Sequence, residues 1–416
     1  MKWISGITLT IVAMLTAGWI FRAELVLFGV AQMRAAYVDI GPTVEIEWST
    51  GADSQGRAPA ERPPNIVLIV ADDMGWNDIS MNASMNGPNP TAQTPNIDAL
   101  AEEGVTFSQG YAAHGTCAPS RAALMSGRYG TRFGFEFTPT PPGFAPVVGM
   151  LNGMKDRPLQ PPSFTNPDAA ALDSLEFAGL GMPPSEITLA ELLADQGYHT
   201  AHIGKWHLGE VNGMAPHDQG FAESILMASG LYGRRDDEDV IQARQEFDPI
   251  DRFLWRVTDF AASFNGGPWY EPPKYLTDYY TEEAVKVIEA NKDRPFFLYL
   301  AHWAPHTPLQ ASREDFDAFS DIELHRERVY VAMIHALDRG VGQVMEALKA
   351  NGLDDKTLVI FTSDNGGAGY IGLPNINAPY RGWKSSLFEG GVRVPFLARW
   401  PAQLPAGETY DAPVHH

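Results

Sequence analysis

The sequence predicts an α/β fold with a mixed, largely parallel central sheet flanked by helices. Two apolar runs, 65–70 and 357–363, are rich in β-branched residues, which is typical of strands buried on both faces of a parallel sheet. Helical and extended patterns alternate between these runs, as they do where helices cover such a sheet. We predict helices over 95–103, 186–196, 281–291 and 323–350, and further strands over 105–113, 199–204, 296–301 and 395–399.

The composition limits the function classes. The chain has 416 residues, with 30 basic and 51 acidic side chains and a formal net charge of −21. This charge argues against nucleic acids and anionic membrane surfaces as partners, so attraction to an anionic substrate has to be local. The single cysteine excludes intramolecular disulfides and leaves the redox compartment open.

The N-terminal residues 1–35 are typical of an export segment. Residues 4–21 are apolar apart from small and hydroxyl residues, they follow Lys2, and a second apolar run covers 25–33. Because no small-x-small cleavage site follows directly, an uncleaved membrane anchor is favoured over a cleaved signal peptide. We therefore expect an exported, periplasmic or extracytoplasmic protein tethered to a membrane, with a linker over 36–62 and a catalytic domain over 63–416.

Paired polar residues follow both apolar runs. Asp72 and Asp73 come after the first, and Asp364 and Asn365 after the second. Ligands are held outside the carboxyl ends of parallel strands, and four hard oxygen donors suit Ca²⁺ or Mg²⁺ better than zinc. The alternative is that these residues only form turns or caps.

Cys117 is predicted to lie at a helix N-terminus. A strand precedes it, and Pro119 stands at an early helical position. Unpaired amides at such a position favour an anion and also a thiolate. A buried structural cysteine is the alternative, because free cysteine is among the most buried residue types.

Three further segments carry candidate side chains. Lys205 and His207 follow the strand over 199–204 and point to the same side if the backbone stays extended. His306 lies between two prolines that fix the local backbone, and Lys384 lies in the glycine-rich stretch 381–395. Taken singly, His207 is more typical of a structural histidine, Lys205 and Lys384 of solvated charges, and the segment of His306 of a structural turn.

The motifs together resemble those of the type I sulfatases of the alkaline phosphatase superfamily. Cys-x-Pro-x-Arg followed by Ala-x-Leu-x-Ser-Gly-Arg, over 117–128, is similar to the family signature, with Ser126 in place of the usual threonine. Gly-Lys-Trp-His-Leu-Gly, over 204–209, resembles a second family motif. A cysteine phosphatase would instead need an arginine at the position of Ala123.

The resemblance implies a chemistry for each candidate. A maturation enzyme would oxidise Cys117 to formylglycine, whose hydrated aldehyde attacks sulfur. Lys205, Lys384 and Arg121 would neutralise the sulfate, His306 would protonate the leaving oxygen, and His207 would contact formylglycine and act as the base. Asp72, Asp73, Asp364, Asn365 and the modified Cys117 would bind the cation, usually calcium.

We therefore expect hydrolysis of a sulfate monoester on a small molecule or carbohydrate. The alternatives are a phosphonate or phosphate monoester hydrolase of the same superfamily and a catalytically inert, membrane-tethered binding protein. The second alternative arises because the family continues past position 416 into a small antiparallel subdomain, which the resemblance predicts to be missing here. Region 132–184 is expected to be irregular and to set specificity, while six aromatic residues form either a substrate wall or core: Phe264, Trp269, Tyr270, Tyr275, Tyr279 and Tyr280.

Overall fold

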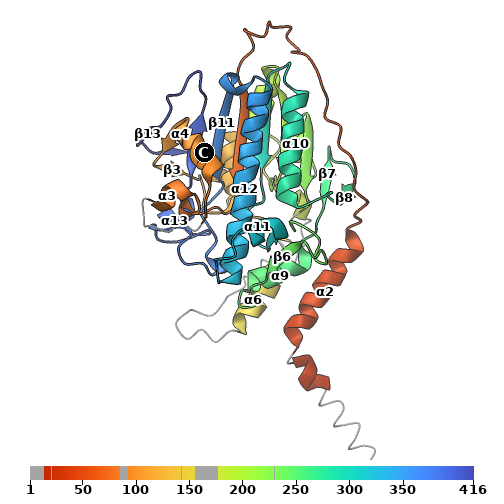
Figure 1. Ribbon diagram of the computed structural model, residues 1–416. Helices are drawn as coiled ribbons and strands as arrows, with labels where there is room; N and C mark the ends of the chain where they lie inside the picture. The colour runs from red at the N-terminus through yellow and green to blue at the C-terminus, as the bar shows by residue number, and fades with distance from the viewer. Residues whose placement is uncertain (1–13, 20, 85–91, 142, 155–176, 229) are drawn as a thin grey trace, which may run out of the picture. The chain divides into compact units, whose positions relative to one another are not determined.

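The two predicted apolar strands lie side by side in one sheet of the computed structural model (Figure 1). β1 (Asn65–Ala71) pairs in parallel with β11 (Thr357–Ser363) along its whole length. The structure describes residues 14–19, 21–84, 92–141, 143–154, 177–228 and 230–416. It divides into a larger unit, residues 40–139, 177–244 and 259–416, and a smaller unit, residues 1–39, 140–176 and 245–258.

Among the described residues, the sheet of the larger unit has ten strands in the order β13-β2-β12-β11-β1-β9-β4-β5-β7-β8. The central strands β11, β1, β9, β4 and β5 are parallel, and β12 and β7 run antiparallel on either side of them. The mixed, largely parallel sheet is therefore confirmed. The remaining strands are β2 (Val105–Phe107), β4 (His199–Gly204), β5 (Glu223–Met227), β7 (Ala262–Phe264), β8 (Trp269–Tyr270), β9 (Phe296–Ala301), β12 (Phe396–Arg399) and β13 (Glu408–Tyr410).

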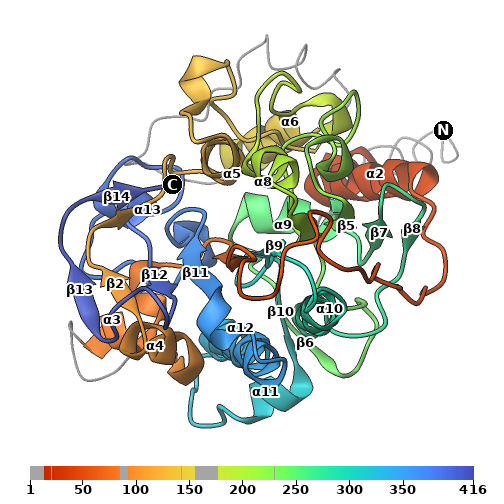
Figure 2. The same cartoon turned by 90° about the horizontal axis from the view of Figure 1, so that it is seen from above.

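Helices cover both faces of this sheet (Figure 2). On β1, Val67 and Ile69 belong to the apolar core under α10 (Leu276–Ala290) and α12 (His325–Ala350). Leu68 and Val70 point the other way, into a second core with residues of α5 and α8. The other helices and strands of this unit are α3 (Ser80–Ser84), α4 (Pro95–Glu102), α5 (Cys117–Ser126), α8 (Leu189–Asp195), α11 (Arg313–Asp317), α13 (Glu389–Val392), β3 (Gly110–Tyr111), β6 (Val240–Ala243), β10 (Leu309–Ser312) and β14 (Val414–His415).

Several element boundaries differ from the predicted ones. The helix predicted to start at Thr281 begins at Leu276, and the Thr281 hydroxyl donates to the Thr277 carbonyl inside it rather than capping its end. The strand predicted over 105–113 is split into β2 and β3. α8 begins at Leu189 because the Thr188 side chain accepts a hydrogen bond from the Glu191 amide.

The described residues of the smaller unit include helices α2 (Arg22–Tyr37), α6 (Phe144–Gly153) and α9 (Pro249–Val257), which share an apolar core that includes Leu27. Region 132–184 is thus not irregular throughout, although its residues 155–176 lie outside the described part. No helix among the described residues has the length and apolar character needed to cross a membrane. Residues 1–13 of the predicted anchor are not described.

The aromatic residues over 264–280 belong to the core. Tyr270, Tyr275, Tyr279 and Tyr280 are buried in the larger unit, which favours the core over a substrate wall for these four, whereas Phe264 and Trp269 are partly buried and pack against the core. Residues of the predicted linker pack in the same core, and the Trp48 indole donates to the Glu283 carboxylate at 2.8 Å.

Candidate active site

The polar residues that follow β1 and β11 meet at one edge of the sheet. Asp72, Asp73, Asp364 and Asn365 are all buried, with at most 3% of any residue exposed. The Asn365 side-chain amide donates to Asp73 Oδ1 at 2.7 Å, and the Asp73 backbone amide donates to Asp364 Oδ1 at 3.2 Å. The structure therefore brings together the four oxygen donors that the sequence placed in two separate segments.

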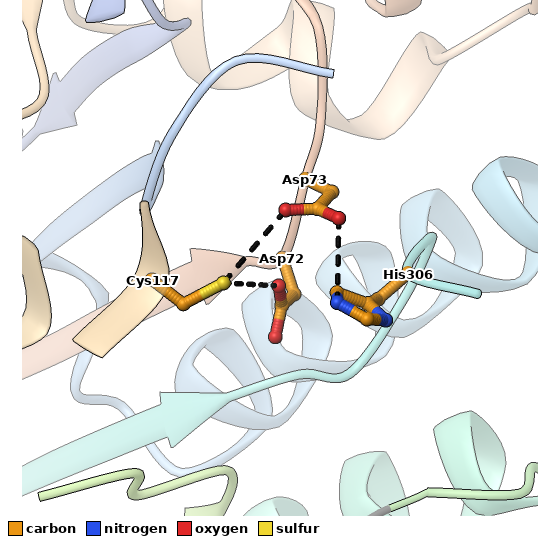
Figure 3. A group of neighbouring side chains, drawn as sticks. All are labelled: Asp72, Asp73, Cys117 and His306. Carbon is orange, nitrogen blue, oxygen red and sulfur yellow. Dashed lines mark hydrogen bonds and ion pairs between the residues drawn. The ribbon is translucent and has the colours of Figure 1, made fainter. Parts of the chain in front are cut away.

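Cys117 is the first residue of α5 and lies against two of these carboxylates (Figure 3). Its Sγ is 3.8 Å from Asp72 Oδ1 and 3.9 Å from Asp73 Oδ1. Burial raises the pKa of the thiol to about 12 and outweighs the opposing effect of the Lys205 and Lys384 charges, while Asp364 and Asp72 add smaller increases. The cysteine at this helix N-terminus is therefore a neutral thiol rather than the expected thiolate, because burial disfavours the charged form.

Arg121 joins the carboxyl ends of three strands. It is fully buried, and its guanidinium donates to Asp364 Oδ2 at 2.9 Å and to Asp72 Oδ2 at 3.2 Å. Its remaining terminal nitrogen donates to the Lys205 carbonyl at 3.1 Å and the Tyr299 hydroxyl at 3.3 Å. The sequence-based role of Arg121 was to neutralise sulfate, whereas its donors in this structure point at protein groups and hold the strand ends in register.

Two lysines approach the same carboxylates from different segments. Lys205 Nζ lies 2.6 Å from Asp72 Oδ2, and Lys384 Nζ lies 2.8 Å from Asp73 Oδ2. The pKa of Lys384 lies well above its ordinary value. Burial alone would lower this pKa, but the combined charges of Asp73 and other groups nearby raise it by a larger amount. The Lys384 backbone amide donates to the Gly367 carbonyl at 3.1 Å, which fixes the loop next to β11.

His306 completes the group that Figure 3 shows. Its Nε2 is 3.4 Å from Asp73 Oδ2 and 3.0 Å from Lys384 Nζ, and its Nδ1 faces the Thr307 carbonyl. Burial and the Lys384 charge hold the pKa of the imidazole well below its ordinary value. A neutral ring that donates from Nδ1 to Thr307 accepts a hydrogen bond from Lys384 at Nε2.

His207 reaches the site by a different backbone path from the predicted one. The chain does not stay extended after β4, because Gly204 has φ 111° and His207 has φ 65°. A Cβ atom on Gly204 would lie 2.0 Å from the Ala301 carbonyl oxygen, so this turn requires glycine. Lys205 and His207 nevertheless line the same cavity.

The two nitrogens of His207 have different surroundings. Nε2 is 3.1 Å from the Pro139 carbonyl oxygen, to which it donates, and Nδ1 is buried without a hydrogen-bond partner among the described residues. Burial, followed by the Lys205 charge, holds the pKa of His207 well below its ordinary value. The ring is therefore neutral near pH 7 and has a lone pair on Nδ1.

The donor set fits a hard divalent cation. Asp72, Asp73 and Asp364 supply buried carboxylate oxygens, and Asn365 Oδ1 is buried without a hydrogen-bond partner among the described residues. Single ligand atoms of Asp72, Asp73, Cys117 and His306 lie within 4.8 Å of one another. Oxygen donors in this number suit Ca²⁺ or Mg²⁺ and require no thiolate.

Sequence reasoning missed three aromatic contributors to the site. The Tyr299 hydroxyl accepts from Arg121, and the Tyr370 hydroxyl lies 3.3 Å from Asp73 Oδ2. Trp303 stacks on His306 with ring centroids 3.9 Å apart. The one sequence signal that Trp303 belongs to the site is its position in the segment His-Trp-Ala-Pro-His. His302, four residues before His306, is fully buried with Tyr280 as a ring neighbour.

Comparison with known proteins identifies relatives over most of the chain. A family model described as Sulfatase matches residues 64–416. The mouse N-acetylgalactosamine-6-sulfatase is 35% identical over 359 residues, which cover 84% of this chain and 60% of that protein. An uncharacterized sulfatase of Escherichia coli, YdeN, is 28% identical over 98% of this chain and 68% of its own length.

A solved structure is also similar to this chain in sequence and in fold. The crystal structure of Ps i-CgsB in complex with k-i-k-neocarrahexaose has a TM-score of 0.66 and 34% sequence identity, over 85% of this chain and 69% of that chain. The present chain thus spans about 60% of the length of the mouse relative. Because one family model accounts for nearly everything after residue 63, the chain belongs to the type I sulfatase family.

Proposed function

We propose that the protein hydrolyses sulfate monoesters to an alcohol or phenol and inorganic sulfate. The observation that carries this proposal is the placement of Cys117 between the Asp72 and Asp73 carboxylates, with the ammonium groups of Lys205 and Lys384 on the same two carboxylates. Formylglycine made from Cys117 would supply a hydrated aldehyde as nucleophile. A cation, calcium before magnesium, held by Asp72, Asp73, Asp364, Asn365 and the modified Cys117, would polarise the sulfate.

The remaining side chains supply charge and proton transfer. Lys205 and Lys384 balance the negative charge of the sulfate oxygens, and the charge that develops on them in the transition state. The hydrogen-bonded pair of Lys384 and His306 protonates the leaving oxygen. His207 accepts a proton at Nδ1, its nitrogen without a partner, so that the nucleophile is regenerated.

The relatives support a carbohydrate substrate. One is a sulfatase of N-acetylgalactosamine 6-sulfate by its name, and another was solved in complex with a neocarrahexaose. We infer a sulfated carbohydrate, or a sulfated small molecule with a comparable ring, as the substrate of this protein.

The test is to express the full chain with a formylglycine-generating enzyme. The mass of the peptide that contains Cys117 is then measured by mass spectrometry, and the protein is assayed on 4-nitrophenyl sulfate and on an aryl phosphonate. We expect a loss of about 18 mass units as sulfur is replaced by oxygen, together with preferred turnover of the sulfate. Preferred turnover of the phosphonate would instead support a phosphonate hydrolase, and an intact thiol without turnover would support an inert binding protein.

We further propose export and a membrane tether. The apolar run over 4–21 supports this, and so do the exposed side chains of Trp19, Leu25 and Phe28 in the N-terminal region. Recovery of the full-length protein in the membrane fraction after alkaline carbonate extraction is the expected result. Release into the supernatant would contradict a stable tether.

A further inference from the structure

We propose that the chain binds one Zn²⁺ ion while Cys117 is still a cysteine, in a site that combines sulfur, nitrogen and oxygen donors. The ligand atoms are Cys117 Sγ, His306 Nε2 and one carboxylate oxygen each of Asp72 and Asp73. This zinc site shares the two aspartates with the cation site of the proposed function, but it uses a thiolate and an imidazole where that site uses further oxygen donors. The inference goes beyond the proposed hydrolysis and does not depend on it.

The four ligand atoms are close enough together to hold one zinc ion. All of them lie within 4.8 Å of one another, and Figure 3 shows the four side chains converging from three segments of the chain. Cys117 Sγ is 3.8 Å from Asp72 Oδ1 and 3.9 Å from Asp73 Oδ1. His306 Nε2 is 3.4 Å from Asp73 Oδ2. Neighbouring ligands of a tetrahedral zinc ion are about 3.3 to 3.6 Å apart, so that only small side-chain shifts are needed.

The donor types favour zinc over the hard cations. Thiolate and imidazole are ordinary ligands of Zn²⁺, whereas Ca²⁺ and Mg²⁺ take oxygen donors. All four residues are buried, which limits competition from water. A thiol that coordinates zinc is deprotonated, and the proton that Cys117 loses passes to the solvent. The thiol form of the chain therefore favours zinc, while a formylglycine at the same position offers only oxygen and favours calcium.

Neighbouring groups already orient two of the ligands. The Thr307 carbonyl faces His306 Nδ1, which leaves the lone pair on Nε2 directed at the carboxylates. Lys205 Nζ lies 2.6 Å from Asp72 Oδ2, and the other oxygen of this carboxylate, Oδ1, faces Cys117. Zinc therefore finds its nitrogen donor and one of its oxygen donors already turned toward the thiol.

Lys384 holds the position that zinc requires. Its ammonium nitrogen lies 2.8 Å from Asp73 Oδ2 and 3.0 Å from His306 Nε2, so that it contacts two of the four ligand groups. The Lys384 side chain is 10% exposed, whereas those of Lys205 and Arg121 are 4% and 0% exposed. Lys384 is thus the cation that can swing out toward solvent when zinc enters.

The charges of the described site also require one cation to leave. Before zinc binds, three carboxylates face three cationic side chains: Asp72, Asp73 and Asp364, and Arg121, Lys205 and Lys384. Zn²⁺ brings two positive charges and the Cys117 thiolate one negative charge, so that binding adds one positive charge to a buried site. Departure of the Lys384 ammonium restores the balance.

The test uses the full chain produced without a formylglycine-generating enzyme, with the thiol of Cys117 verified by mass spectrometry. After treatment with EDTA, the protein is titrated with Zn²⁺ against a chromophoric chelator, and separately with Co²⁺ as a spectroscopic substitute. We expect one tightly bound zinc ion per chain, and a thiolate-to-cobalt charge-transfer band in the near ultraviolet. Cys117→Ser should abolish this band and weaken zinc binding by about 100-fold or more.

Two further variants test the other contacts. His306→Ala should weaken zinc binding by about 100-fold, whereas His217→Ala, whose side chain is 40% exposed, should not change it. Lys384→Met should strengthen zinc binding by about ten-fold, because its ammonium group no longer competes for Asp73 and His306. Lys349→Met, whose side chain is 45% exposed, is the matched control and should leave the affinity unchanged. A gain in affinity cannot come from misfolding, so the Lys384 variant keeps the test valid where a ligand variant fails to fold.

Several results would overturn the inference: unchanged zinc affinity in Cys117→Ser or His306→Ala, a cobalt complex without the thiolate band, or weaker zinc binding in Lys384→Met. The same titration of the converted chain, together with turnover of 4-nitrophenyl sulfate, separates the zinc site from the proposed function. Equal zinc affinity before and after conversion would remove the thiol from the zinc site and leave hydrolysis standing. Tight zinc binding by the thiol form, with no turnover after conversion, would overturn the proposed hydrolysis and leave the zinc site standing.

Discussion

At the scale of single residues, Asp72 has the densest set of ionic contacts in the described site. Its Oδ2 atom lies 2.6 Å from Lys205 Nζ and 3.2 Å from an Arg121 nitrogen. Asp72→Ala should reduce calcium affinity by about ten-fold or more and destabilise the fold by about 3 kcal/mol, because two buried cations lose a partner. Calcium titration and urea unfolding measure the two effects. Asp195→Ala on the exposed end of α8 is the control, and equal affinity in both variants would remove Asp72 from the metal site.

His306 offers a second prediction at this scale. If the Lys384 and His306 pair protonates the leaving oxygen, His306→Ala should lose about 100-fold in kcat/KM on an alkyl sulfate. The loss on 4-nitrophenyl sulfate should be much smaller, because nitrophenolate leaves without a proton. Equal losses on both esters would contradict the role in leaving-group protonation. His217→Ala, whose side chain is 40% exposed, should behave as wild type on both.

Asp78 gives a prediction for the pH dependence of stability. Burial raises the pKa of its carboxyl from 3.8 to about 7, although Tyr330 and the Gly75 amide donate hydrogen bonds to it. The unfolded chain therefore releases this proton near pH 4 and the folded chain only near pH 7, so that the folded state binds more protons between these values. Its contribution to stability is largest below pH 4 and falls by about 4 kcal/mol as the pH rises to 7.

Asp78→Asn replaces the titrating carboxyl group with an amide, which does not exchange a proton in this pH range. The unfolding free energy of the variant minus that of wild type should therefore increase by about 4 kcal/mol between pH 4 and pH 7, as measured by urea unfolding at each pH. A constant difference across this range would show that Asp78 is ionised in the folded protein throughout.

Motifs located the candidate side chains, but only the fold revealed their contacts. The position of Cys117 at the start of a helix could be predicted from Pro119 and the preceding strand. The protonation of its thiol could not, because it depends on burial by segments distant in the sequence, among them the carboxylates 44 and 45 residues away. Likewise, the continuous apolar run of β9 predicts that Tyr299 is buried, but not that its hydroxyl accepts a hydrogen bond from Arg121 of α5.

At the scale of elements, the turn after β4 directs Lys205 and His207 into the site. Gly204→Ala should destabilise the protein by about 3 kcal/mol or more, because φ 111° is unfavourable for alanine and its Cβ would collide with the Ala301 carbonyl. Gly127→Ala is the matched control, since Gly127 has φ 64° with no atom within 4 Å of its added Cβ, and should cost about 1 kcal/mol. Thermal unfolding compares them, and similar costs would show that the contact with Ala301 relaxes freely.

The sequence pattern predicted which segments are helices and which are strands. It was less accurate for the residues at which these elements begin. The strand over 296–301 was placed correctly, since its apolar run has polar residues and a proline before it. α10 starts five residues before Thr281, because Leu276, Tyr279 and Tyr280 are buried in the core and extend the helix beyond the position where a threonine suggested a cap.

At the scale of the whole molecule, the net charge of −21 would repel the sulfate ester that we propose as substrate before the local lysines can attract it. Raising NaCl from about 10 mM to about 150 mM shortens the screening length from about 30 Å to about 8 Å. We expect KM for 4-nitrophenyl sulfate to fall about two-fold over this range while kcat stays constant. A KM that rises with salt would show that the lysines of the site dominate the approach of the substrate.

The division into two units could not be read from the sequence. Residues 140–154 and 245–258 lie within the range predicted as a single catalytic domain, yet they pack with α2 through Leu27, Val148 and Phe253. Their amphipathic patterns show that apolar faces exist, but no local signal says which distant helix covers each face.

Under the proposed conversion of Cys117 to formylglycine, the burial of this residue sets an order of events in the biogenesis of the protein. Only 1% of this residue is exposed, so a maturation enzyme cannot reach its side chain in the folded chain. Conversion therefore has to occur on the nascent or still unfolded polypeptide, and folding competes with it in time. Because the sequence has no other cysteine, titration of thiols in denaturant would count the molecules that were not converted.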